Sequence, residues 1–171
     1  MSERIGIGSR LVIGAVAGFV GTMAMTAAMR RLHARLPVRE RYPLTPREIV
    51  DSTLAPPPGD AAKDLTIAAH FAYGAATGAL LAAADPKVGR FAGAMAGAGV
   101  WLASYMGWIP AFGVLKPATD HPPRRNLLMI TVHLVWGWTT AEAMRELVAA
   151  RETIFDDGPD RDVPGKGGSR G

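Results

Sequence analysis

Four long runs of apolar residues constrain the fold of this chain more than any other feature. The runs cover residues 11–29, 65–84, 91–115 and 127–148. The first three contain no charged residue, and the fourth is uncharged as far as Ala141. A helix needs ~20 apolar residues to cross the hydrocarbon core of a bilayer. A soluble helix of similar length carries a polar stripe at a period of 3.6 residues, which the first run lacks. The pattern therefore predicts an all-α integral membrane protein, a bundle of four transmembrane helices.

The segments outside these runs predict two tails and one long loop. They are an N-terminal tail over 1–10, a basic loop over 30–64 and a polar, disordered tail over 149–171. In the loop, Thr45 and Glu48 have the spacing of a capping box around Pro46, which predicts a short surface helix as far as Leu54. The tight turn at 85–90 predicts that the second and third spans are antiparallel neighbours. With four crossings, both termini lie on the same side of the membrane.

Two of the runs contain nearly the same polar phrase. It reads His70-Phe-Ala-Tyr73-Gly74-Ala-Ala-Thr77 in one and His133-Leu-Val-Trp136-Gly137-Trp-Thr-Thr140 in the other. The first and third runs also match, since Gly14 and Gly18 are spaced like Gly93 and Gly97, and such small-xxx-small patterns let helix backbones approach closely in lipid. The bundle thus reads as two tandem helical hairpins related by a pseudo-two-fold axis, with chance similarity between Ala/Gly-rich helices as the alternative.

The polar members of the two phrases form a candidate interior site. They are His70, Tyr73, Thr77, His133, Trp136 and Thr140. A histidine inside a bilayer faces protein or water rather than lipid, and the two rings have a similar depth. One interpretation is that each imidazole fixes packing through one interhelical hydrogen bond. The alternatives are a haem or a metal ion held by His70 and His133, a bound anionic small molecule, or a proton or small-solute pathway. No cofactor is predicted, because no carboxylate in the spans is placed to orient the rings.

A second set of polar residues follows the first span and precedes the fourth. Its members are Arg30, Arg31, His121, Arg124, Arg125 and Asn126. We expect them to contact the anionic head groups of membrane lipids, or else an anionic substrate. The net charge of +4 is explained in the same way, and no nucleic-acid-binding motif is present, so nucleic acid is not a predicted partner.

The sequence gives little support for catalysis. The chain has no cysteine, which excludes disulfides and thiol chemistry. Asp120 and His121 have no nucleophile nearby, so the prediction leans against an enzyme. An aromatic stripe typical of a membrane interface is formed by Trp101, Tyr105, Trp108 and Phe112. Pro110 is expected to kink or end the third helix.

Several phrases resemble an uncharacterised bacterial family of small multi-pass membrane proteins. They lie at 39–47, 70–75, 101–110, 117–122 and 124–129. More distantly, the chain resembles the YagU-like inner-membrane proteins. The resemblance covers roughly residues 10–148 and implies a multi-pass protein of the bacterial inner (cytoplasmic) membrane, without catalytic residues to carry over.

The expected function is therefore a non-catalytic structural or stress-related role in that membrane. The first alternative is binding of haem, a metal or an anionic small molecule at His70 and His133. The second is a solute or proton pathway, which would require a homo-oligomer because four short helices enclose little room.

Overall fold

The computed structural model describes residues 5–54 and 59–155, and the regular elements in this part of the chain are all helices. The long helices are α1 (Ile7–His33), α3 (Asp60–Ala84), α4 (Arg90–Ala103) and α6 (Pro123–Arg151). The shorter elements are η1 (Val38–Glu40), α2 (Thr45–Leu54), the π-helical turn η2 (Ser104–Trp108), α5 (Ile109–Ala111) and η3 (Ala118–Asp120). The prediction of an all-α protein is confirmed.

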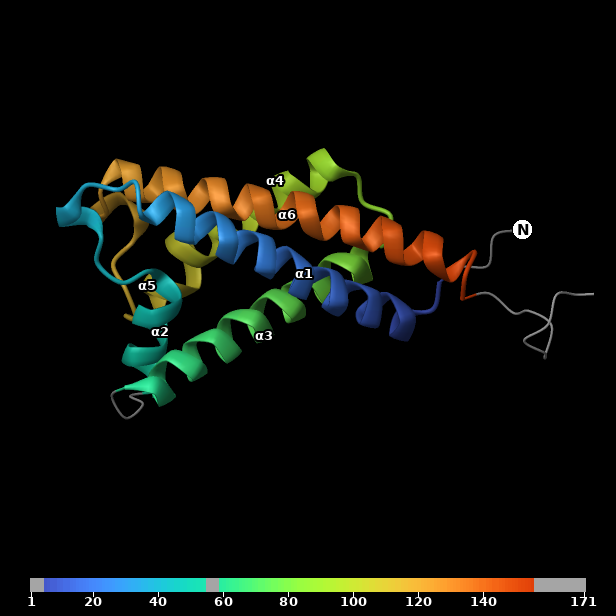
Figure 1. Cartoon of the computed structure of the whole chain (residues 1–171), viewed down its shortest axis with the longest axis horizontal. Helices are drawn as coiled ribbons and strands as arrows, with labels where there is room; N and C mark the ends of the chain where they lie inside the picture. Colours follow the sequence, from blue (N-terminus) through green and yellow to red (C-terminus); the bar gives the residue numbers. More distant parts are fainter. Residues whose placement is uncertain (1–4, 55–58, 156–171) are drawn as a thin grey trace, which may run out of the picture.

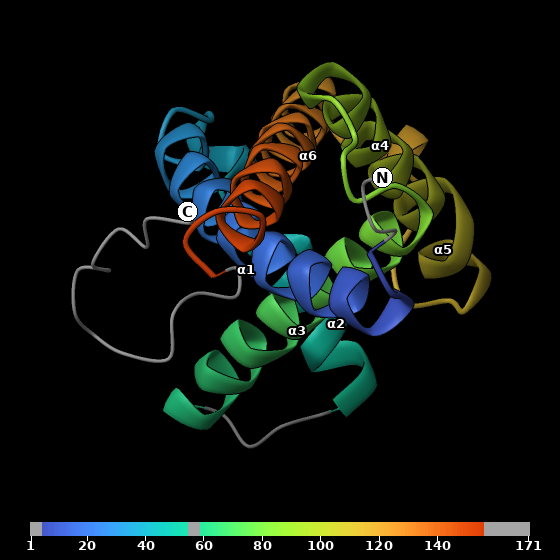
Figure 2. The same ribbon diagram turned by 90° about the vertical axis from the view of Figure 1, so that its right-hand side faces the viewer.

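The four long helices run up and down along the length of the molecule (Figure 1). The start of α1 and the end of α6 lie at one end, and α2, α5 and the loops around them lie at the other (Figure 1). α1 packs against both α3 and α6, and α6 packs against α4. α3 and α4 are joined by the predicted tight turn but diverge from it, so they are not the packed neighbours that the turn predicts (Figure 2).

The helices differ in extent from the predicted spans. α1 and α3 are the two helices of the described residues that are both long and apolar enough to cross a membrane. The predicted third span, 91–115, is broken: α4 ends at Ala103, and Gly107 in the π-helical turn has non-helical dihedral angles. Pro110 lies in the first turn of α5, where its missing N–H group costs no hydrogen bond. The described helices therefore exceed the four of the predicted bundle.

The tail boundaries also differ from the prediction. α1 begins at Ile7, inside the predicted N-terminal tail, and α6 continues to Arg151, inside the predicted C-terminal tail. The rest of the predicted disordered tail, from residue 156, lies outside the described residues, as do residues 1–4.

Glycines form two close helix seams, one in each hairpin. Gly78 of α3 lies between Gly14 and Gly18 of α1, and a Cβ atom added to Gly78 would come within 2.6 Å of the Gly18 Cα. In the second hairpin, Gly137 of α6 lies in the same way between two glycines of α4, Gly93 and Gly97. The helices can approach this closely only because no side chain separates their backbones.

Candidate functional site: a cavity between the helices

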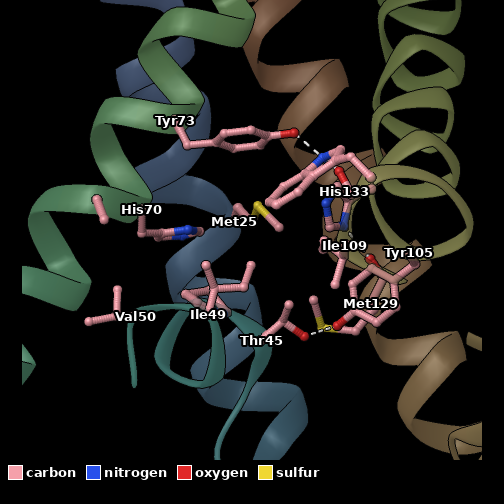
Figure 3. A pocket seen from close by; sticks show the side chains of 14 residues that line it. Met25, Thr45, Ile49, Val50, His70, Tyr73, Tyr105, Ile109, Met129 and His133 are labelled. Carbon is pink, nitrogen blue, oxygen red and sulfur yellow. Dashed lines mark hydrogen bonds between the residues drawn. The ribbon is translucent and has the colours of Figure 1, made fainter. Parts of the chain in front are cut away.

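A cavity of about 230 Å³ lies between α1, α3, α6 and the π-helical turn, with α2 closing one end (Figure 3). Its walls are mainly apolar and are supplied by side chains such as Met25, Ile49, Ile109 and Met129. Among the described residues, no Asp, Glu, Lys or Arg lines it. The cavity therefore has a few polar groups among mainly apolar walls, the usual composition of a small-molecule site.

His70 and His133 both line this cavity. His70 extends into it from α3, and His133 extends from α6 on the opposite side, with Met25 of α1 between them in the view of Figure 3. The matching positions of the two histidines in the repeated phrase thus bring both rings to one cavity.

The hydrogen bonds of the two rings differ. The Nδ1 atom of His133 donates to the backbone oxygen of Met129, 2.7 Å away on its own helix. A neutral imidazole with a proton on Nδ1 has a lone pair on Nε2, so His133 presents a hydrogen-bond acceptor. The Nε2 atom of His70 is buried and has no hydrogen-bond partner in the part of the chain that the structure describes. Neither nitrogen makes the interhelical hydrogen bond that a pure packing role predicts.

Two pairs of hydroxyl groups border the same cavity. Ser104 donates to the backbone oxygen of Val100 at 2.8 Å, so the Tyr73 hydroxyl, 3.1 Å away, is the donor in the Tyr73–Ser104 bond. The hydroxyls of Thr45 and Tyr105 form a second, short hydrogen bond. This second pair has two hydroxyl protons, and the bond between the two groups uses one of them. The other proton can be donated to a third group.

The Thr45–Tyr105 bond also changes the interpretation of α2. The sequence predicts a capping box, but Thr45 bonds Tyr105, and Glu48 bonds Arg125. Val50 of α2 is only 2% exposed. The predicted surface helix therefore packs on the bundle and forms one wall of the cavity.

Arg125 holds the loop before α2 in place. Its side chain is 2% exposed, donates to the backbone oxygens of Tyr42, at 3.1 Å, and Pro43, and lies 3.3 Å from the Glu48 carboxylate. Its guanidinium also lies 3.6 Å from the centre of the Tyr42 ring, a cation–π contact. These protein groups surround Arg125, which the sequence assigned to lipid head groups.

The other predicted head-group contacts have mixed surroundings. Arg30, Arg31 and Arg124 are exposed. Asn126 donates to the backbone oxygen of Ala118 at 2.6 Å. His121 Nε2 donates to the Lys116 backbone oxygen, 3.3 Å away, and its Nδ1 atom lies 3.4 Å from the Tyr42 hydroxyl. Asn126 and His121 therefore fix the loop, and the three arginines remain available to an outside partner such as a lipid head group.

The remaining members of the predicted interior site lie beside the cavity. Thr77 and Trp136 line a smaller void of about 30 Å³, which His133 also borders. Thr140 is fully buried at the contact between α6 and Gly21 of α1, and its hydroxyl has no partner. The structure thus brings His70, Tyr73 and His133 together and places the other three one or two turns away.

The cavity also contains residues that the sequence analysis did not assign to the site. They are Met25, Thr45, Pro46, Ile49, Val50, Ala69, Ser104, Tyr105, Trp108, Ile109 and Met129. The aromatic stripe was the available signal for Tyr105 and Trp108, which both line the cavity. Thr45 gave no such signal, because its role depends on the folding of α2 back onto the bundle.

The unequal packing of the two hairpins accounts for the smaller void beside the cavity. Gly21 lets α1 touch the backbone of Trp136 on α6. When Gly14 is matched to Gly93, the counterpart of Gly21 on α4 is Val100, which lines the smaller void together with Tyr73. Because valine has a branched side chain where glycine has none, α4 cannot approach α3 as α1 approaches α6.

The geometry defines the class of the protein as an all-helical bundle with an internal cavity and two helices able to cross a membrane. Within the described residues, no three His, Asp or Glu side chains are grouped as for a metal ion. Comparisons with protein-family models, with curated proteins and with solved structures gave no match.

Proposed function

We propose that this chain is a multi-pass protein of the bacterial inner membrane in which α1, α3, α6 and the α4–α5 segment each cross the bilayer. Every one of these helices presents large apolar side chains outward. The exposed fractions of Val12, Leu80, Phe91 and Leu127 are 65%, 71%, 76% and 65%. Exposed apolar surface on all sides of a bundle is suited to lipid rather than to water, and the family resemblance points to the same location.

We further propose that the protein binds a small, uncharged molecule in the cavity. The observation that supports this most directly is the unpartnered Nε2 atom of His70, which is buried at a cavity that also contains His133. A buried polar atom without a partner costs about 1–3 kcal/mol, and a bound molecule with a hydrogen-bonding group removes that cost.

The same features rank the other candidate functions. A purely structural role for the histidines is less favoured, because neither ring makes a hydrogen bond to another of the described helices. His133 Nδ1 bonds its own helix, and His70 Nε2 has no partner among the described residues. An anionic ligand is less favoured, because no cationic side chain lines the cavity and a buried charge requires a partner. Arg125 is near α2 but is engaged by Glu48 and two backbone oxygens.

Filling the cavity tests this proposal. Ala69 lines the cavity, whereas Ala72 lies on the exposed surface of the same helix. We expect ethylbenzene and 4-ethylphenol to raise the unfolding temperature of the detergent-purified protein and of Ala72→Phe, but not of Ala69→Phe. The anion 4-ethylbenzoate should have no effect. Equal responses of the two variants, or a response to the anion alone, would contradict the proposal.

A further inference from the structure

The volume of the cavity suits a ligand of about one ring. An engineered, apolar protein cavity of ~150 Å³ binds benzene, and drug-sized ligands occupy pockets of about 300–1,000 Å³. At about 230 Å³, this cavity is large enough for a benzene ring with a small substituent. It is small for a haem or a phospholipid head group with its chains.

The walls favour an aromatic ring over an aliphatic chain. Tyr105 presents an aromatic side chain to the cavity, and Met25 and Met129 present thioethers (Figure 3). Trp108 also lines the cavity. Aromatic rings pair with each other edge-to-face or offset-stacked, and sulfur makes favourable contacts of about 0.3–1.5 kcal/mol with a ring. A flat ring can use both kinds of contact at once.

The polar groups favour a hydroxyl on that ring. The Nε2 atom of His133 is an acceptor, because its Nδ1 proton is given to the Met129 backbone oxygen. The Thr45–Tyr105 pair has one proton left to donate. A hydroxyl both donates and accepts, whereas a carbonyl or an ether only accepts and leaves the His133 lone pair without a partner.

We infer that the cavity recognises a phenol, a single-ring aromatic molecule whose hydroxyl donates to His133 Nε2 and accepts from His70 Nε2 or from the Thr45–Tyr105 pair. This inference rests on the proposed function and specifies its ligand class. A phenol matches the cavity in size, in the aromatic and sulfur character of the walls, and in the absence of charged lining residues.

The test compares three probes that share an ethyl-substituted ring and carry a hydroxyl, a methoxy group or a hydrogen atom opposite the ethyl group. They are 4-ethylphenol, its methyl ether 4-ethylanisole, and ethylbenzene, each titrated into the full-length protein in micelles. Affinities are expressed as probe concentration within the micelle, so that different partitioning does not bias the comparison. The protein is labelled with 15N in its four histidines, and each resonance is assigned by the variant that removes that histidine. The Nε2 resonance of His133 then reports the hydrogen bond directly.

We expect 4-ethylphenol to bind about tenfold more tightly than 4-ethylanisole, as one buried hydrogen bond predicts. It should also displace the His133 Nε2 resonance, whereas ethylbenzene should not. In His133→Leu the affinity ratio should fall to about one. The matched control is His33→Leu, whose ring contacts the Tyr42 backbone oxygen outside the cavity and whose loss should leave the ratio unchanged.

Other outcomes separate this inference from the proposed function. If the three probes bind equally tightly and Ala69→Phe blocks them all, the phenol inference is overturned while the cavity remains a ligand site. If no probe binds, both proposals fail. If Zn²⁺ displaces the resonances of His70 and His133 and no phenol does, the cavity is a bis-imidazole metal site and the inference is wrong.

Discussion

Gly97 and Gly99 lie two residues apart on α4 but have different surroundings. A Cβ atom on Gly97 would overlap the His133 backbone oxygen, whereas one on Gly99 would meet nothing within 4 Å. We expect Gly97→Ala to lower the free energy of unfolding by about 1–3 kcal/mol, as overpacking does. Gly99→Ala should leave it unchanged or raise it by less than about 1 kcal/mol. Unfolding by sodium dodecyl sulfate in mixed micelles measures both, and equal losses would show that the seam does not depend on backbone contact.

At this scale, the sequence identified the residues with the clearest local signal. His70, Tyr73 and His133 stand out because they are polar inside apolar runs, and all three line the cavity. Arg125 and Thr45 were misjudged, because each appears in a loop or at a helix end where solvent or lipid is the usual neighbour. Their burial depends on the way the loop folds back onto α6, and no local pattern predicts that contact.

The position of α2 depends on Arg125 at the start of another helix. We expect Arg125→Ala to release the segment before α2, because the Tyr42 and Pro43 backbone oxygens and the Glu48 carboxylate lose their donor. Trypsin cleavage after Arg39 and Arg41, both exposed, should become several-fold faster. Stability should fall by about 1–3 kcal/mol. The neighbour Arg124 is exposed, so Arg124→Ala is the matched control, and equal cleavage of the two variants would exclude the anchoring role.

Helices as elements were easier to predict than their breaks and their partners. The apolar runs located α1, α3 and α6, and the loop pattern located α2. The sequence placed the break in the third run at Pro110, but the break begins at Ser104. The chain changes direction in the π-helical turn, where Gly107 has non-helical dihedral angles. The divergence of α3 from α4 follows from the bulk of single side chains, which periodicity does not measure.

The number of membrane crossings can be tested on the whole molecule, because the chain contains no cysteine and one introduced thiol is unique. With four crossings, Lys87→Cys and Thr119→Cys should react with a membrane-impermeant maleimide from opposite sides. If only α1 and α3 cross, the two thiols react from the same side. Both positions are exposed.

A second pair of thiols checks the position of the termini. Lys87 pairs with Glu152 at 3.2 Å, which places the α3–α4 turn beside the end of α6. Glu152→Cys should therefore react from the same side as Lys87→Cys, and Arg39→Cys from the other. Labelling of Glu152→Cys and Arg39→Cys from the same side would contradict the up-and-down arrangement of the proposed crossings.

The two glycine seams and the side of the bundle between α3 and α4 would respond differently to sequence change. In the seams, main chain touches main chain, so almost any substitution forces two helices apart. Between α3 and α4, the spacing depends on replaceable groups, above all Val100 and the Tyr73–Ser104 bond. Relatives with this fold could therefore differ in the ligands that the cavity binds through exchange of a few side chains on that side. The glycine seams that hold the histidines in place would stay the same.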